Sequence, residues 1–112
     1  MKLTFRVLIA LNERKYARRI KKVVEPEVIA SGRSRLAYFY ARYIIKGRFP
    51  LGEPVIATDA LNAFSYARFA LKAPFPLGEP VIAVSEYAAS YYLWLTRLGY
   101  ADDAKRFKEI AE

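Results

Sequence analysis

The chain has 112 residues, a formal charge of +8, and neither cysteine nor histidine. A chain of this length forms one domain, and the missing side chains exclude disulfides, zinc–thiolate sites, cysteine nucleophiles and histidine catalysis. No clustered carboxylates favour an all-oxygen metal site. Arg6 interrupts the apolar N-terminal segment, which argues against a signal peptide, and no run approaches the roughly 18 apolar residues of a membrane span. We expect a cytoplasmic protein without metal, cofactor or membrane contact.

The first predicted helix begins after Asn12, a suitable N-cap, and runs from Glu13 to about Val24. Pro26 is expected to end it, because proline disfavours helix in the residue before it. A short apolar segment over 28–30 follows.

A break at 31–32 separates this region from a second helix, which we predict over 35–46 with Ser34 as its N-cap. Gly47 suits the left-handed position just past the end of that helix.

A connector over 49–54, with the sequence FPLGEP, then leads into a short helical turn over 55–57. Pro54 fits the first helical position, where its missing N–H costs nothing. Thr58 or Asp59 caps the third predicted helix, over 60–72.

The same connector returns over 75–80 and is followed by a second short turn over 81–83. We predict a fourth helix over 86–98, capped by Ser85 and closed by Gly99, and a short last helix opened by Asp102.

The central feature of the sequence is a stretch that occurs twice. YARYIIKGRFPLGEPVIA over 40–57 and YARFALKAPFPLGEPVIA over 66–83 agree at thirteen of eighteen positions, 26 residues apart. Weaker traces lie outside the copies: residues 16–18 precede the first YAR, Tyr92 follows Tyr66 by 26, and 25–30 resemble EPVIA with one insertion. Copying of this kind is typical of supersecondary units that bury their apolar faces against neighbouring units.

These patterns predict an all-α fold: a small right-handed α-solenoid or helical-repeat bundle of about four long helices joined by proline–glycine elbows and short helical turns. We divide the single domain 1–112 into a degenerate N-terminal repeat over 1–33, repeats over 34–59 and 60–85, and a capping repeat over 86–112.

One face of the repeated helix is predicted to be core. In the first copy the i, i+3, i+4, i+7 positions are Ala37, Tyr40, Ala41 and Ile44, and the second copy has its equivalents over 63–70. Small residues beside a tyrosine allow helices to approach closely, and each buried hydroxyl then needs a partner. A platform on which nucleic-acid bases stack is the alternative interpretation.

No catalytic constellation emerges, so we expect no enzyme; the serines have neither a histidine to activate them nor a GxSxG elbow. The best functional candidates are cations at i, i+4 spacing on corresponding helices, which would form a ladder if the helices stack in register. With the basic N-terminal cluster, the candidate binding residues are Arg14, Lys15, Arg18, Arg19, Lys21, Lys22, Arg42, Lys46, Arg68 and Lys72. The alternative is that Glu53 and Glu79 pair with these cations internally.

Charge is unevenly distributed along the chain. Residues 1–48 hold thirteen Lys or Arg and three Glu, a net +10, whereas residues 49–112 hold six Lys or Arg and eight Asp or Glu, a net −2. Such polarity attracts polyanions or acidic protein surfaces, although net charge also serves solubility alone.

The stretch over 40–83 resembles the short tandem helical repeats of tailed-phage and prophage-like proteins, which read loosely as YA-x-x-V-[IL]-KGR-[FW]-P-E-x-E. The GR of that pattern is kept at Gly47-Arg48, whereas Ala73-Pro74 departs from it. The resemblance implies an α-helical repeat protein of viral or mobile-element origin, and it implies no activity.

Three functions remain open. The first is a non-enzymatic interaction module that binds a protein partner with an acidic surface, in a phage setting a modulator of a host protein. The second is nucleic-acid binding through the basic N-terminal half. The third is homo-oligomerisation through incompletely capped ends, with Tyr91, Tyr92 and Trp94 as contact residues.

Overall fold

The computed structural model describes residues 17–112, and their side chains from residue 24 onward. This part of the chain is all-α, as predicted, and contains no strand. Its α-helices are α2 (Ala17–Ala30), α3 (Ser34–Phe39), α4 (Glu53–Ile56), α5 (Ala60–Ser65), α6 (Glu79–Ala83), α7 (Ala88–Arg97) and α8 (Ala101–Ala111). Two π-helical segments, η2 (Tyr40–Ile45) and η4 (Tyr66–Leu71), continue α3 and α5, and two 3-10 turns, η3 (Pro50–Gly52) and η5 (Pro76–Gly78), precede α4 and α6. Within these residues no helix is both long enough and apolar enough to cross a bilayer.

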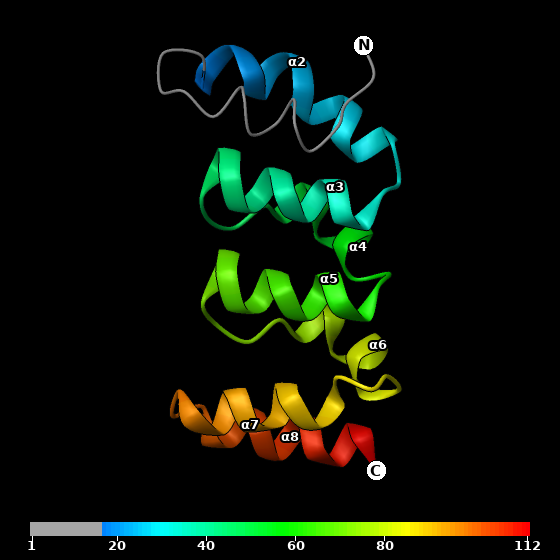
Figure 1. The fold of residues 1–112 in the computed structure, drawn as a ribbon, viewed down its shortest axis with the longest axis vertical. Helices are drawn as coiled ribbons and strands as arrows, with labels where there is room; N and C mark the ends of the chain where they lie inside the picture. The colour runs from blue at the N-terminus through cyan, green and yellow to red at the C-terminus, as the bar shows by residue number, and fades with distance from the viewer. Residues whose placement is uncertain (1–16) are drawn as a thin grey trace.

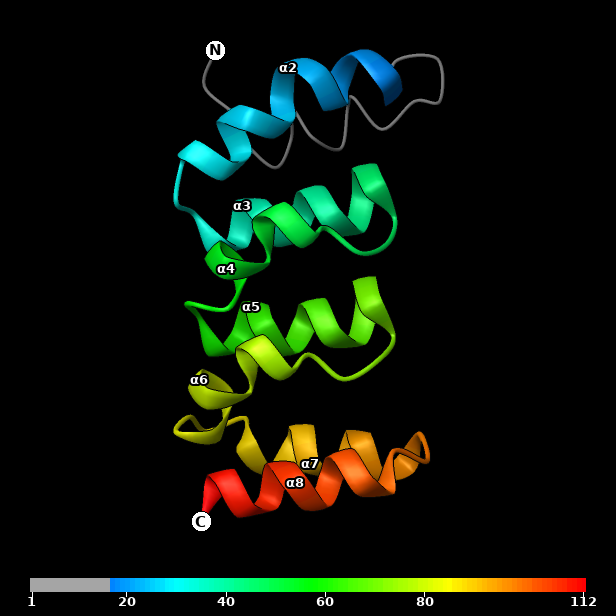
Figure 2. The same cartoon turned by 180° about the vertical axis from the view of Figure 1, so that it is seen from behind.

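The helices form two layers in a molecule of 43 × 24 × 20 Å. The long helices α2, α3, α5 and α7 follow one another in chain order along the longest axis (Figure 1). The view from behind shows α4, α6 and α8 in front of this row (Figure 2). Helices α3 and α5 pack against each other and against α4 and α6 respectively, and α7 packs against both α6 and α8.

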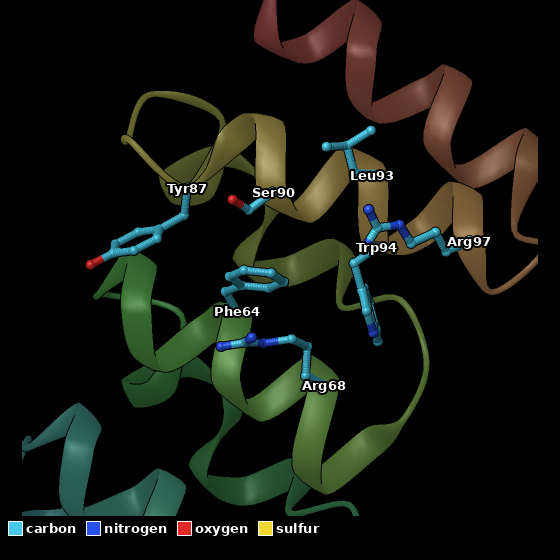
Figure 3. A pocket seen from close by; sticks show the side chains of 7 residues that line it. All are labelled: Phe64, Arg68, Tyr87, Ser90, Leu93, Trp94 and Arg97. Carbon is cyan, nitrogen blue, oxygen red and sulfur yellow. The ribbon is translucent and has the colours of Figure 1, made fainter.

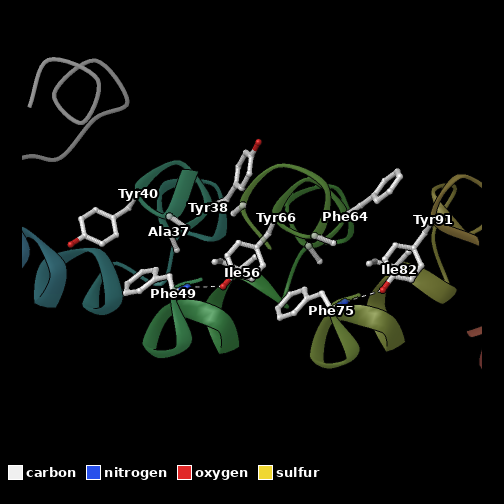
Figure 4. Close-up of a cluster of buried hydrophobic side chains, with 14 of the residues drawn as sticks. Ala37, Tyr38, Tyr40, Phe49, Ile56, Phe64, Tyr66, Phe75, Ile82 and Tyr91 are labelled. Carbon is white, nitrogen blue, oxygen red and sulfur yellow. Dashed lines mark hydrogen bonds between the residues drawn. The ribbon is translucent and has the colours of Figure 1, made fainter. Parts of the chain in front are cut away.

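Aromatic pairs between the two layers form the core. Tyr40 contacts Phe49 with ring centroids 5.0 Å apart, and Tyr66 contacts Phe75 at 4.9 Å. The four side chains are at most 2% exposed, and Figure 4 shows the two pairs side by side. Around them lie the small residues of the predicted face, which are buried as expected: Ala37, Ala41, Ala63, Ala67 and Ala70.

The two connectors hold the layers at a fixed spacing because glycine allows a phenylalanine ring to pack on the backbone. A Cβ added to Gly78 would lie 2.7 Å from Cδ2 of Phe75 and 2.8 Å from the Cβ of Ala63. Gly52 has the same relation to the ring of Phe49. These glycines serve close packing.

The buried hydroxyls of Tyr66 and Tyr91 find their partners in the two connectors. Tyr66 donates to Oε2 of Glu53 at 2.6 Å and accepts from the Phe49 N–H at 2.7 Å. Tyr91 repeats this arrangement with Glu79 at 2.8 Å and the N–H of Phe75 at 3.0 Å. The dashed lines in Figure 4 mark the two bonds from backbone N–H groups.

The same contact extends to the first described helix. Tyr40 donates to Oε2 of Glu25 at 2.9 Å, so Glu25 accepts from Tyr40 as Glu53 accepts from Tyr66. The prediction that Tyr92 corresponds to Tyr66 is wrong, because Tyr91 occupies that position. One residue fewer separates these tyrosines than separates the two sequence copies.

The helix ends differ from the expected glycine caps. Lys46 and Lys72, with φ of 61° and 54°, take the left-handed position, whereas Gly47 does not. The cause is the π-helical turn: the N–H of Lys46 bonds to the carbonyl of Ala41, five residues back, at 2.7 Å. The wider turn ends each helix one residue earlier than predicted.

The end of α2 and the start of α3 also differ from the prediction. Pro26 lies inside α2, which continues to Ala30, because Val24 and Val28 on either side of it are both buried and hold the helix to the core. Ser34 is the first residue of α3 and its hydroxyl accepts from the side chain of Asn62, so it is not the N-cap.

Several predicted caps are correct. Asp59 caps α5 by accepting from the Asn62 N–H at 3.0 Å. Pro54 lies in the first turn of α4, and Gly99 closes α7 with φ of 87°. Helix α7 begins at Ala88, two residues later than predicted, because Ser85 closes a turn with the carbonyl of Ile82.

Candidate functional site

The arginine of the first copy lies on aromatic rings. Arg42 donates from Nη1 to the hydroxyl of Tyr38 at 2.8 Å. Its guanidinium carbon Cζ is 5.1 Å from the ring centroid of Tyr43 and 4.4 Å from that of Phe69, which belongs to the next long helix. This cation–π contact joins two successive units and holds the guanidinium in place.

The arginine of the second copy is held in the same manner. Its Cζ lies 4.0 Å from the ring centroid of Phe64 and 4.8 Å from that of Phe69. Arg68 also keeps a buried Nε for which the described residues offer no hydrogen-bond partner. A buried donor without an acceptor is costly, since the group has left water without compensation.

These contacts form a continuous line, which we call the arginine–aromatic row. Phe69 bridges the two arginines, and Phe64 meets Trp94 of α7 with ring centroids 6.2 Å apart. The row thus crosses three successive long helices, and its members are Arg42, Tyr43, Phe64, Arg68, Phe69 and Trp94.

The repeated glutamates do not neutralise this row. Oε2 of Glu53 is 3.1 Å from Nε of Arg48, and Oε2 of Glu79 is 2.9 Å from Nη2 of Arg106. The internal network considered from the sequence therefore exists, but with different arginines. Among the described carboxylates none pairs with Arg42 or Arg68.

The predicted lysines occupy a different environment from the arginines. Lys46 and Lys72 are exposed, each at the left-handed residue that ends its helix. The arginines are half-buried against rings. The structure thus fixes the arginines in place and leaves the lysine side chains at the surface.

Most of the basic N-terminal cluster is not placed. Arg14 and Lys15 lie outside the described residues. For four further cations the structure gives a helical backbone in α2 and no side-chain position: Arg18, Arg19, Lys21 and Lys22. Their predicted role in binding stays a prediction.

A cavity of about 440 Å³ opens where the row meets α7. It is lined by Phe64, Arg68, Tyr87, Ser90, Leu93, Trp94 and Arg97. Figure 3 shows these side chains: Phe64 lies in the middle, with Tyr87 on one side, Trp94 on the other and the Arg68 guanidinium against its ring. A smaller cavity of about 190 Å³ lies between α7 and α8, beside Tyr92 and Phe107.

The sequence did not reveal the larger cavity, since four of its lining residues lie on α7, where the repeat pattern fades. The one-residue shift at Tyr91 hides the correspondence of Trp94 to Phe69. Tyr91 is itself fully buried, so it is not available as an oligomer contact, contrary to that hypothesis. A useful signal was present in the copies: Tyr38 is replaced by Phe64 exactly one period later, before an arginine that is kept.

Comparison with known proteins adds no assignment. No protein-family model, no curated protein and no solved structure matches the chain. Within the described residues no group of three or more acidic side chains is placed to hold a metal ion. The geometry of the arginine–aromatic row and its cavity is therefore the basis for a functional proposal.

Proposed function

We propose that the chain is a non-enzymatic helical-repeat module, a small α-solenoid, that binds a protein partner with an acidic surface. The likeness of the two copies supports the solenoid: residues 34–56 and 60–83 run through the same order of α, π, 3-10 and α elements. The left-handed lysines and the tyrosine–glutamate bonds recur at the same places. Such units bury their faces by stacking and leave an extended surface for a partner.

The observation that carries the proposal is the position of Arg42 and Arg68. Both are held against rings, and no described carboxylate balances their charge. A guanidinium that is already ordered loses little conformational entropy when a carboxylate docks on it. Arginine and aromatic residues are also the side chains that carry most binding energy in protein interfaces.

Apolar surface beside the arginines favours a protein partner. Phe69 is 43% exposed between the two guanidinium groups, and Leu93 is 50% exposed at the cavity. A protein surface offers both carboxylates and apolar side chains to such a mixture. A nucleic-acid backbone would use the charges and leave the leucine uncovered.

Nucleic-acid binding remains the second candidate because of the net +10 of residues 1–48. That charge is concentrated before the row, in the segment whose side chains are not placed. The signature of nucleic-acid binding is an affinity that falls steeply as the salt concentration rises. Binding through the row should respond less to salt, because part of that surface is apolar.

The test is a comparison of partner capture by two charge-reversed variants. Arg42→Glu/Arg68→Glu changes the row, and Lys105→Glu/Lys108→Glu makes the same change in charge on α8. Wild type and each variant are used as bait in lysate with and without nuclease treatment, and captured proteins are identified by mass spectrometry. We expect a protein retained by wild type and by the α8 variant and lost with the row variant. Capture that disappears on nuclease treatment would favour the second candidate.

A further inference from the structure

Two corresponding junctions between long helices differ in whether the arginine has a tyrosine hydroxyl as its acceptor. In the first junction Tyr38 supplies an oxygen that accepts from Nη1 of Arg42 at 2.8 Å. In the second, 26 residues later, Phe64 replaces the tyrosine while Arg68 is kept. Arg68 therefore lacks the acceptor that its counterpart has, and its buried Nε is without a partner among the described residues.

The cavity lies at the junction that lacks this oxygen. Arg68 and Phe64 form part of its wall, and α7 adds the Ser90 hydroxyl and Arg97. The rest of the lining is apolar or aromatic, from Leu93, Trp94 and Tyr87, as Figure 3 shows. At about 440 Å³ the cavity is within the size range of pockets that bury a small group.

We propose that this cavity binds the carboxylate of an Asp or Glu side chain of the partner protein, flanked by an apolar residue. The inference rests on the proposed function and deepens it by naming the group that is recognised. A carboxylate supplies the acceptor that Arg68 lacks, and charged hydrogen bonds of this kind are about twice as strong as neutral ones. The apolar residue would pack against Leu93 and Trp94, which the carboxylate alone would leave exposed.

Charge around the cavity favours one carboxylate over a phosphate backbone. Burial, together with the nearby carboxylates of Glu86 and Asp59, raises the pKa of the Tyr87 hydroxyl. Two carboxylates thus lie near the Tyr87 end of the cavity, whereas Arg68 and Arg97 line other parts of its wall. A continuous polyanion would meet repulsion at that end, and a single carboxylate beside Arg68 would not.

The chain contains one tryptophan, Trp94, so its fluorescence reports on this cavity alone. The probes are acetyl-leucyl-glutamyl-leucinamide, its glutamine counterpart and an eight-nucleotide oligothymidylate. We expect a saturable change with the glutamyl peptide, with a dissociation constant on the order of millimolar for so small a ligand. An equal response to the glutaminyl peptide would overturn the proposal, as would a response to the oligonucleotide only.

Two variants test the missing acceptor. Arg68→Gln should weaken binding of the glutamyl probe about tenfold or more. Phe64→Tyr, which restores the hydroxyl of the other junction without changing charge, should also weaken it several-fold. Lys105→Gln removes an exposed cation of α8, outside the row, and is the control that should leave binding within about twofold. Unchanged binding in both Arg68→Gln and Phe64→Tyr would refute the assignment.

The two proposals fail separately. If the glutamyl probe binds as expected but the row variant still captures the partner, the proposed function is wrong and only the preference of the cavity for a carboxylate stands. If the probe does not bind while the row variant loses the partner, the binding role of the row is supported and the cavity is not a carboxylate site.

Discussion

At the scale of single residues, three tyrosine–carboxylate contacts connect the layers of the molecule. Burial is the main cause that raises the pKa of Tyr40, Tyr66 and Tyr91 above the ordinary value of 10.0, and hydrogen bonding to a glutamate adds to it. The sequence predicted these tyrosines as core and the need for a partner. It could not identify that partner, because the glutamates lie 12 to 15 residues away in the chain.

Alkaline pH should unfold the protein through these groups. A pKa that is higher in the folded than in the unfolded state gives stability that is fully present below pH 10 and is lost as pH rises further. The free energy of unfolding in urea should therefore be flat from pH 8 to about 9.5 and then fall steeply. The decrease in unfolding free energy with pH should be shallower in Tyr66→Phe. An identical decrease in that variant would contradict its attribution to the Tyr66 hydroxyl.

The Tyr91 hydroxyl can also be tested at neutral pH. Tyr91→Phe removes an acceptor from the N–H of Phe75 and a donor from Glu79, which is 1% exposed. We expect a loss of about 2 kcal/mol in the free energy of unfolding, because both groups stay buried. Tyr92→Phe, one position on and half-buried, is the control and should change stability by less than about 0.5 kcal/mol. An equal loss of stability in the two variants would contradict the assignment of Tyr91, rather than Tyr92, as the counterpart of Tyr66.

At the scale of elements, the ends of the long helices were the hardest part to predict. Proline, glycine and capping rules identified the N-cap of α5 at Asp59 and the residue that closes α7, Gly99. They failed at Pro26, where buried valines hold the helix across a proline, and at Gly47, where a π-turn moves the left-handed position to Lys46. At Pro26, packing against the core overrides a local preference, and at Gly47 the hydrogen-bond pattern of the wider turn decides which residue is left-handed.

The left-handed lysines give an element-scale prediction. A non-glycine residue in this conformation costs roughly 1–2 kcal/mol relative to glycine. Lys72→Gly should therefore raise the free energy of unfolding by about 1 kcal/mol, as measured in urea. Lys105→Gly, in the middle of α8, should lower it by about as much. Destabilisation by Lys72→Gly would mean that the lysine side chain itself supports the helix end.

The last helix is attached by a single ion pair to a buried carboxylate. Arg106 on α8 contacts Glu79, whose side chain is 1% exposed, with two N–O distances of 2.9 and 3.0 Å. Arg106→Ala would leave this carboxylate buried without its counter-charge, so we expect a loss of about 3 kcal/mol in the free energy of unfolding. Arg106→Lys should recover part of that loss. A neutral effect of Arg106→Ala would show that α8 docks through Phe107 and its apolar neighbours alone.

At the scale of the whole molecule, the sequence predicted the all-α class. Its prediction of a short last helix opened by Asp102 is wrong, because α8 begins at Ala101 and has 11 residues, one more than α7. It also identified Arg42 and Arg68 as candidates, although for the wrong reason. They were expected to form a ladder with lysines, and the structure places them on rings instead, which the helical period alone does not reveal. The cavity was missed because it depends on the packing of α7 against α5, where the copies no longer match.

The most direct test of the account is amide hydrogen exchange on the captured complex, compared with the protein alone. If the arginine–aromatic row and its cavity bind the partner, protection should appear over 42–43, 64–72 and 87–97, and α8 should be unchanged. Protection confined to α8, or to the connectors 50–54 and 76–80 on the opposite layer, would contradict the account.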